Sequence, residues 1–261
     1  MAVIAIAGKG GVGKTVISAL MLRCFVENDE IREKGVLVID ADPSVSLPFA
    51  LGLEVKRTIG DLREKISGGY EGPVDVLIEN EISDIIVRTH LFSLIAMGRP
   101  EGPGCYCLVN DMLRHFIARL SSRFGTILID CEAGLEHLSR RTTQDVDVMI
   151  VVSDVTKRGL MTAAAIKNLS EHIHINFRHA FLVINKVPDA HPVHIEEAER
   201  ITGMRVAGIV PEDHIVQSFD REGKPIFEIP DESKAVIAVR IIADFVISKI
   251  SPKTSAHTDF Q

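Results

Sequence analysis

The sequence contains few cysteines, few aromatic residues and no long uncharged apolar segment. Its 261 residues include four cysteines, two tyrosines and no tryptophan, and aromatic side chains make up 5% of the chain. Four cysteines are too few for a secreted disulfide framework, and a chain of this length buries enough surface to fold without one. The longest apolar runs, residues 1–7 and 235–247, are too short or are interrupted by charges, so we expect no transmembrane helix.

An excess of positive charge is also missing. Lysine and arginine number 29 against 36 aspartate and glutamate residues, which gives a formal net charge of −7. This balance gives no overall attraction to nucleic acid or to an anionic membrane. The first apolar stretch is not preceded by the basic segment of a signal peptide. We therefore expect a cytoplasmic protein that acts without a nucleic-acid or membrane partner.

The hydrophobic pattern is that of a globular protein, with 46% hydrophobic and 25% charged residues. Short apolar runs alternate with segments suited to helices. The runs lie at residues 2–7, 36–39, 126–129, 146–152, 180–184 and 205–210, with further strand candidates at 74–79 and 91–96. Helices are predicted at residues 14–26, from 107 to about 123, and at 235–250. The alternation predicts a single-domain α/β fold over residues 1–250, a mostly parallel sheet flanked by helices on both faces, followed by a polar tail at 251–261.

A glycine-rich segment follows the first predicted strand. Its sequence is Gly8-Lys9-Gly10-Gly11-Val12-Gly13-Lys14-Thr15, which matches the P-loop pattern. Small residues in such a loop let backbone N–H groups surround phosphate oxygens, and the N-terminus of the following helix adds positive potential. Lys14 is placed to reach the β- and γ-phosphates and Thr15 to ligate Mg²⁺. The segment therefore predicts a P-loop NTPase.

Three aspartates follow predicted strands on the side of the sheet where the P-loop lies. Asp40 and Asp42 follow the strand at 36–39, and Asp130 ends the Walker B-like strand at 126–129. Open α/β sheets bind ligands at the carboxyl ends of their strands. Asp130 is a candidate to hold Mg²⁺, which proteins bind through a few carboxylates together with phosphates and water. The alternative is that these aspartates only cap loops or helices.

Cys105 and Cys107 form a Cys-x-Cys pair between a loop rich in glycine and proline and a predicted helix. A helix N-terminus favours the thiolate, which is the form that binds soft metals. Two thiolates are half of a tetrahedral four-sulfur site, and a two-fold axis through the pair would supply the other half from a second subunit. The pair predicts one metal per homodimer. Otherwise the two cysteines are incidental or form a strained disulfide.

Lys9 makes the P-loop resemble the deviant Walker A motif of a family of dimeric ATPases. This family includes the nitrogenase iron protein, the MinD and ParA positioning ATPases and several metallocentre assembly factors. The resemblance implies that Lys9 reaches the phosphates bound by a partner subunit, so that ATP controls dimerisation. It also implies that Asp42 orients or deprotonates the attacking water and that Asp40 helps to organise Mg²⁺.

The same resemblance indicates where the base binds. Members of the family contact the base through an Asn side chain and a proline-led loop. The matching residues here are Asn185, Lys186, Pro211, Glu212 and Asp213. A GTPase of this class would more often carry Asn-Lys-x-Asp, whereas here the aspartate comes one position later. ATP, with ADP as its product, is therefore the expected nucleotide.

Two segments resemble CooC-type proteins, the nickel-handling maturation ATPases of carbon monoxide dehydrogenase. They are residues 98–107, which contain the Cys-x-Cys pair, and residues 130–138. The resemblance implies nickel, or zinc in its place, bound between subunits, with ATP binding and hydrolysis linked to dimerisation and metal delivery. Residues 130–137 would form a switch. In this switch Cys131 is a metal ligand or a packing residue, and His137 is a candidate metal ligand. Cys24, in the first predicted helix, is expected to be a buried apolar residue.

The sequence therefore predicts a slow ATPase and homodimeric metallochaperone that assists nickel insertion into carbon monoxide dehydrogenase or acetyl-CoA synthase. The alternative is a MinD/ParA-like positioning ATPase that acts on membrane or DNA. The Cys-x-Cys pair and a polar tail without an amphipathic helix disfavour that alternative. An electron-donating iron protein is a third option, but the second cysteine of its cluster-binding pattern is missing.

Overall fold

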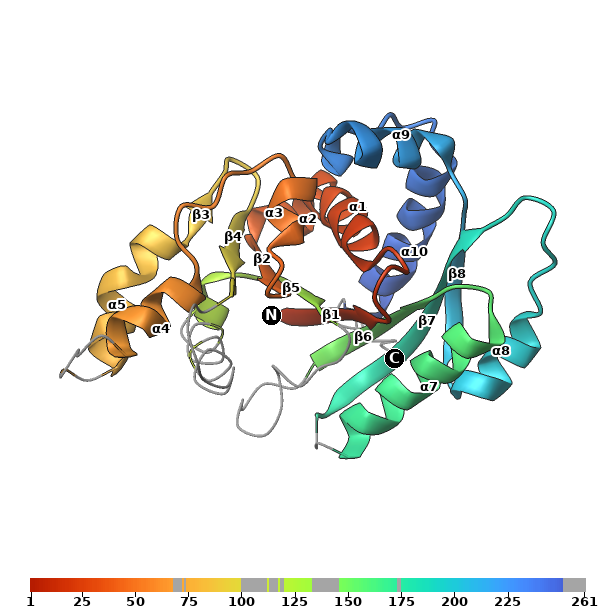
Figure 1. Cartoon of the computed structure of the whole chain (residues 1–261), viewed down its shortest axis with the longest axis horizontal. Helices are drawn as coiled ribbons and strands as arrows, with labels where there is room; N and C mark the ends of the chain where they lie inside the picture. The colour runs from red at the N-terminus through yellow and green to blue at the C-terminus, as the bar shows by residue number, and fades with distance from the viewer. Residues whose placement is uncertain are drawn as a thin grey trace, which may run out of the picture.

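A largely parallel sheet runs through the molecule (Figure 1). The computed structural model describes residues 1–67, 72, 74–99, 112, 117, 120–132, 146–172 and 175–250. Within these residues eight strands form one sheet in the order β3-β4-β2-β5-β1-β6-β7-β8. The strands are β1 (Ala2–Gly8), β2 (Val36–Ala41), β3 (Val87–Arg88), β4 (Ser93–Ala96), β5 (Thr126–Cys131), β6 (Val146–Ser153), β7 (Phe177–Val187) and β8 (Arg205–Pro211). Neighbouring strands are parallel except for β3 and β4, which confirms the predicted sheet.

Helices cover both faces of this sheet (Figure 1). They are α1 (Lys14–Glu27), α2 (Asp29–Glu33), α3 (Ser46–Ala50), α4 (Ile59–Ser67), α5 (Val74–Ile85), α7 (Lys157–His172), α8 (Ile195–Thr202), α9 (His214–Glu222) and α10 (Lys234–Ile250), with short 3₁₀ turns η1 (Ser121–Arg123) and η3 (Ile226–Glu228). No helix in these described ranges is long and apolar enough to cross a membrane. The single-domain α/β architecture agrees with the sequence-based expectation.

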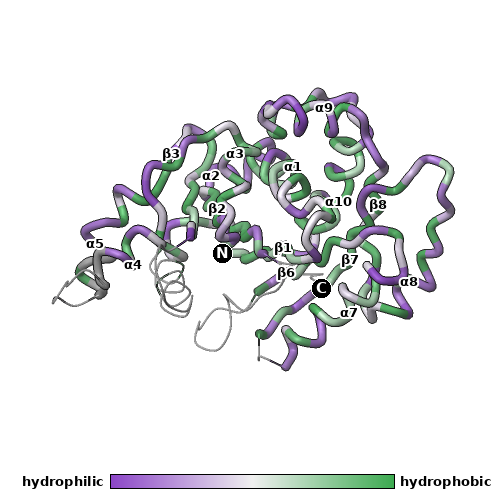
Figure 2. Tube along the Cα trace, viewed as in Figure 1, coloured by the Kyte–Doolittle hydropathy of each residue, from purple (hydrophilic) through white to green (hydrophobic). Residues whose placement is uncertain are grey.

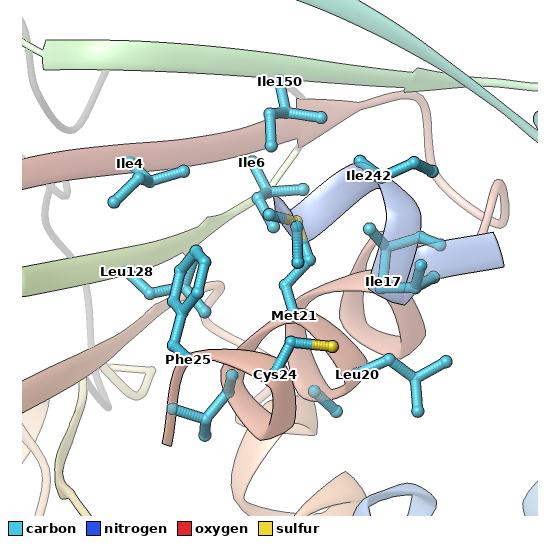
Figure 3. Packing of buried hydrophobic residues seen from close by; sticks show 14 of the residues in the cluster. Ile4, Ile6, Ile17, Leu20, Met21, Cys24, Phe25, Leu128, Ile150 and Ile242 are labelled. Carbon is cyan, nitrogen blue, oxygen red and sulfur yellow. The ribbon is translucent and has the colours of Figure 1, made fainter. Parts of the chain in front are cut away.

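The buried strands divide the core into two layers. Ile4 and Ile6 of β1 pack with side chains of α1 and α10, whereas the alternate residues Val3 and Ala5 belong to the layer on the opposite face. Figure 3 shows Ile4 and Ile6 on the side of the sheet that faces Met21 of α1. Because both faces are covered, the strands are almost continuously apolar. Figure 2 shows hydrophilic residues concentrated along the outer loops and helices, such as α9.

One predicted strand is wrong. Residues 74–79 begin the helix α5 and are not a strand. The apolar pattern continues beyond the six-residue window to Ile82 and Ile85, which lie about one helical turn apart and pack against the same core layer. Glu81, the residue before Ile82 in this helix, accepts a hydrogen bond from Arg57 at 2.5 Å. A short apolar window by itself cannot distinguish a strand from a helix.

The other predicted elements that can be compared agree with the structure. The candidate at 91–96 contains β4, and the final helix at 235–250 is α10. β7 is longer than predicted, and the short antiparallel β3 has no counterpart in the prediction. Most of the helix predicted after Cys107 and all of the tail at 251–261 lie outside the described residues.

Candidate nucleotide-binding site

The P-loop connects β1 to α1 and requires glycine for backbone reasons. Gly11 and Gly13 have φ of +81° and +89°, a region that L side chains rarely adopt. A Cβ atom on Gly8 would lie 2.3 Å from the backbone O of Val152, so β1 and β6 leave no room there for a side chain. Gly13 is the N-cap of α1, and no side chain caps this helix. The first N–H groups of α1 are therefore available to an anion.

The two lysines of the loop differ in burial. Lys14 is only 8% exposed, and its Nζ donates to the backbone O of Lys9 over 3.4 Å. Lys14 thus folds back over the loop, where a bound phosphate would lie. Lys9 is exposed. Its side chain is accessible to a second molecule.

Asp130, at the end of β5, binds hydroxyl groups next to the P-loop. Its Oδ2 accepts from Thr15 Oγ1 and its Oδ1 from Ser18 Oγ, both at 2.9 Å. Thr15 Oγ1 also lies 3.3 Å from Oγ of Ser46, the first residue of α3. The tertiary structure therefore brings together Thr15 and Asp130, the residues that the sequence connects with Mg²⁺.

Asp40 organises the loop that follows β2. Its Oδ1 accepts from the backbone N of Asp42 and its Oδ2 from that of Leu47, both at 3.0 Å. Asp42 in turn accepts from the backbone N of Ser44 at 2.9 Å. These contacts match the loop-capping alternative for Asp40, and the roles of Asp40 in Mg²⁺ binding and of Asp42 in catalysis stay predictions. Val45 in the same loop has φ of +53°, an unusual conformation for a β-branched residue.

Asp40 and Asp130 are paired across neighbouring parallel strands. Burial and the nearby Asp130 carboxylate raise the pKa of Asp40 to about 8. Burial raises the pKa of Asp130 to about 6, against the hydrogen bonds from Ser18 and Thr15 and the charge of Lys14, which lower it. Burial, which disfavours the charged form, is the main cause of both shifts, so negative charge on these carboxyls is only partly compensated here. A divalent cation beside Asp130 would supply the compensating positive charge, so this donor set fits Mg²⁺.

Two residues at the end of β7 that were predicted to contact the base bind the P-loop in this structure. Asn185 Nδ2 donates to the backbone O of Val12, and Lys186 Nζ donates to that of Gly11, each at 2.8 Å. Asn185 is buried and Lys186 is exposed. A contact of either residue with the base stays a prediction.

Asp213, after β8, joins the starts of two helices. Its Oδ1 accepts from the backbone N of Ile215 at 2.8 Å, which caps α9. Its Oδ2 accepts from Ser233 Oγ at 2.6 Å and from the backbone N of Ala235 at 3.1 Å, at the start of α10. Burial alone would raise the pKa of Asp213, but the hydrogen bonds from Ser233, Ala235 and Ile215 outweigh it and hold the pKa below its ordinary value.

A cavity of about 420 Å³ lies beside this junction. Glu212, Asp213 and Lys234 are among the residues that line it. Its volume is in the range of small-molecule sites. Glu212 and Asp213 thus lie at a cavity, while Pro211 is the last residue of β8. Base recognition by these three residues stays a prediction.

The described cysteines are buried. Burial raises the pKa of the Cys24 thiol to about 11, and Cys24 packs in the core layer of α1 and α10. Cys131 packs in the opposite layer, as in the packing alternative. Among the described residues no group of three or more His, Cys, Asp or Glu side chains could hold a metal. Cys105, Cys107 and His137 lie outside the described residues, so the Cys-x-Cys site stays a prediction.

Two serines of the site were not found by sequence reasoning. Ser18 lies three residues after Thr15 on α1 and so shares its helix face, a signal that the spacing contains. Ser46 approaches Thr15 only because of the path of the loop after β2. No local pattern predicts that approach.

These features together define a P-loop nucleotide-binding protein. The glycine-rich loop, the buried Lys14 and the contact between Thr15 and Asp130 are its characteristic parts. Residues 3–226 match the CobQ/CobB/MinD/ParA nucleotide binding domain. The chain belongs to this family.

Several known proteins are similar over almost the whole chain. An uncharacterized ATP-binding protein of Methanocaldococcus jannaschii is 39% identical over 254 residues, covering 95% of this chain and 99% of that protein. The carbon monoxide dehydrogenase accessory protein CooC of Rhodospirillum rubrum is 30% identical over 261 residues, covering 90% and 94%. The septum site-determining protein MinD of Pyrococcus horikoshii, solved with Mg-ADP, aligns with a TM-score of 0.68 at 21% identity, covering 94% and 95%. This last likeness shows the shared fold.

Proposed function

We propose that this protein is a slow ATPase and homodimeric metallochaperone that assists nickel insertion into carbon monoxide dehydrogenase or acetyl-CoA synthase. The observation that carries the proposal is the 30% identity to CooC of Rhodospirillum rubrum over 90% of this chain. That relative is named as an accessory protein of carbon monoxide dehydrogenase, and the client is inferred from its name. The Cys-x-Cys pair, Cys105 and Cys107, adds candidate metal ligands.

In this proposal the site around Asp130 binds Mg-ATP. Lys14 binds the β- and γ-phosphates, and Thr15 and Asp130 hold Mg²⁺, with Asp40 shaping the adjoining loop. Mg²⁺ neutralises phosphate charge when it is bound. Asp42 orients or deprotonates the attacking water. The contact of 2.9 Å between Thr15 and Asp130 supports this assignment.

ATP and metal act through the dimer. The exposure of Lys9 supports its reach toward the phosphates of the partner subunit. Cys105 and Cys107 from both subunits give four thiolates for one metal ion. Nickel is the cargo, and zinc can occupy the same thiolate set. The cavity beside Glu212 supports a base-binding role for the segment after β8.

Anaerobic native mass spectrometry tests the metal site. The protein is titrated with Ni²⁺ or Zn²⁺, with and without Mg-ADP or Mg-ATP, and compared with the double variant Cys105→Ala/Cys107→Ala. We expect one metal per two wild-type chains and none in the double variant, with ATP binding retained. Cys24→Ala is the matched control and should keep the metal, because Cys24 is buried and its thiol pKa is raised to about 11.

Unchanged metal binding in the double variant would refute the Cys-x-Cys site. If no metal binds and ATP alone produces the dimer, metal delivery is wrong. The MinD/ParA-like alternative then becomes the function to test, by ATP-dependent co-sedimentation with vesicles or DNA.

A further inference from the structure

The end of β7 departs from a regular strand where Asn185 meets the P-loop. β7 and β8 are in register at Ile184 with Ile209 and again at Val187 with Pro211, so β7 contains one residue more between these pairs. The extra residue forms a β-bulge. Lys186, within the bulge, has φ of +56°, in the left-handed region that favours glycine.

The bulge directs two consecutive side chains to one target. In a regular strand, Asn185 and Lys186 would point to opposite faces of the sheet. Here Asn185 donates to the backbone O of Val12 and Lys186 to that of Gly11, both at 2.8 Å. The left-handed backbone at Lys186 is unfavourable by itself, and the surrounding contacts must offset it.

The P-loop backbone is shaped to receive these side chains. A Cβ atom on Gly13 would lie 2.5 Å from Asn185 Nδ2 and 3.6 Å from Lys186 Cε. Because a trans peptide is planar, a fixed C=O of Val12 turns the N–H of Gly13 to the opposite side. The two side chains therefore fix the orientation of backbone that, in a P-loop, surrounds phosphate.

We propose that Asn185 and Lys186 are positioning residues that hold the P-loop in its phosphate-binding shape, whatever base the ligand carries. The inference rests on the proposed role of residues 8–15 as the phosphate-binding loop. It differs from a contact with the base, which would act on adenine and leave binding of a base-free polyphosphate unchanged.

Isothermal titration calorimetry with Mg²⁺ and three ligands, ATP, GTP and inorganic tripolyphosphate, separates the two roles. Asn185→Ala and Lys186→Met each remove one donor to the loop. We expect each variant to raise the dissociation constants of all bound ligands by the same factor, about tenfold. Lys186→Arg keeps a charged donor and should restore most of the affinity. Lys167→Met, which removes a lysine paired with Glu171 on α7, is the matched control and should change none of the three constants.

A second comparison separates positioning from simple charge attraction. Asn185→Ala removes no charge, so its effect cannot come from long-range electrostatics. For Lys186→Met the titrations are repeated at about 0.5 M salt, where attraction between exposed charges is strongly screened. The loss of affinity in Lys186→Met should persist at this salt concentration. Thermal unfolding without ligand identifies folded variants, and Lys186→Met carries the test if Asn185→Ala does not fold, because Lys186 is exposed.

The results that overturn the proposal are distinct from those that overturn the function. If ATP affinity falls while the tripolyphosphate constant stays within about twofold, the residues contact the base and positioning is wrong. Unchanged constants for all ligands also refute it. A wild-type chain that binds none of the three ligands refutes instead the proposed phosphate-binding loop.

Discussion

Asp213 offers a test of how the starts of α9 and α10 are held together. One buried carboxylate accepts three hydrogen bonds and joins the start of α9 to the start of α10. Asp213→Ala removes all three bonds. Asp213→Asn keeps one oxygen for the cap of α9, but its NH2 group is a donor and can accept from neither Ser233 nor Ala235.

The structure gives a graded magnitude for these changes. Loss of an N-cap costs about 1 kcal/mol. Leaving the two donors at Oδ2 without their charged acceptor costs about 2 kcal/mol more. We therefore expect the free energy of unfolding to fall by about 2 kcal/mol in Asp213→Asn and by about 3 kcal/mol in Asp213→Ala. For a chain of this size, 3 kcal/mol corresponds to a Tm lower by roughly 6–12 °C.

Urea and thermal unfolding of the nucleotide-free protein, followed by circular dichroism, measure these differences. Asp220→Asn, an exposed change on α9, is the matched control and should stay within about 0.5 kcal/mol of wild type. A double-mutant cycle with Ser233→Ala should show coupling between Ser233 and Asp213. Additive effects would contradict the contact of 2.6 Å between them.

The contribution of Asp213 to the free energy of unfolding depends on pH with a fixed sign. Because the folded state holds the pKa of Asp213 below its ordinary value of 3.8, its stabilising effect is complete above that pH. The effect is lost as the pH falls through the lower folded-state pKa. The stability difference between wild type and Asp213→Asn should therefore shrink in acid. A wild-type Tm in Asp213→Asn at neutral pH would refute the reasoning.

Gly13→Ala should weaken ATP binding at least about tenfold, because its Cβ would lie 2.5 Å from Asn185 Nδ2 at a φ of +89°; unchanged affinity in calorimetry would contradict this steric argument. Without nucleotide and Mg²⁺, the free energy of unfolding should decrease as the pH rises. Burial and Asp130 raise the pKa of Asp40 from 3.8 to about 8, so the folded state binds a proton more tightly than the unfolded state. This contribution of Asp40 to stability is complete below the unfolded pKa and is lost as the pH rises through about 8. Urea midpoints measured against pH should show the decline, and Asp40→Asn should flatten the profile. A flat wild-type profile would exclude this contribution. Val45→Asn should raise the free energy of unfolding by about 0.5–1 kcal/mol, since asparagine tolerates the left-handed backbone better than a β-branched residue does; a lower Tm in thermal unfolding would show that Val45 packing outweighs backbone strain.

Much of the fold follows from patterns that are local in the sequence. The strand at 2–7, the glycine loop and helix α1 were predictable because apolar runs, glycines and helical spacing act within a few residues. The helix α5 was mistaken for a strand because the window at 74–79 ended before the repeat at Ile82 and Ile85. The antiparallel β3 has only two residues, too few for a period to be recognised.

The sequence by itself determined the P-loop, its buried strand and the acidic strand ends, because each is set by neighbouring residues and by backbone requirements for glycine. The tertiary structure alone decided which polar groups meet. Asp130 binds Ser18 across 112 residues, and Asn185 reaches Val12 across 173. Such pairs depend on strand order and on a bulge that redirects Lys186. Local spacing places Ser18 on the same helix face as Thr15, but it does not give the partner of either side chain, because packing of distant segments creates the contact.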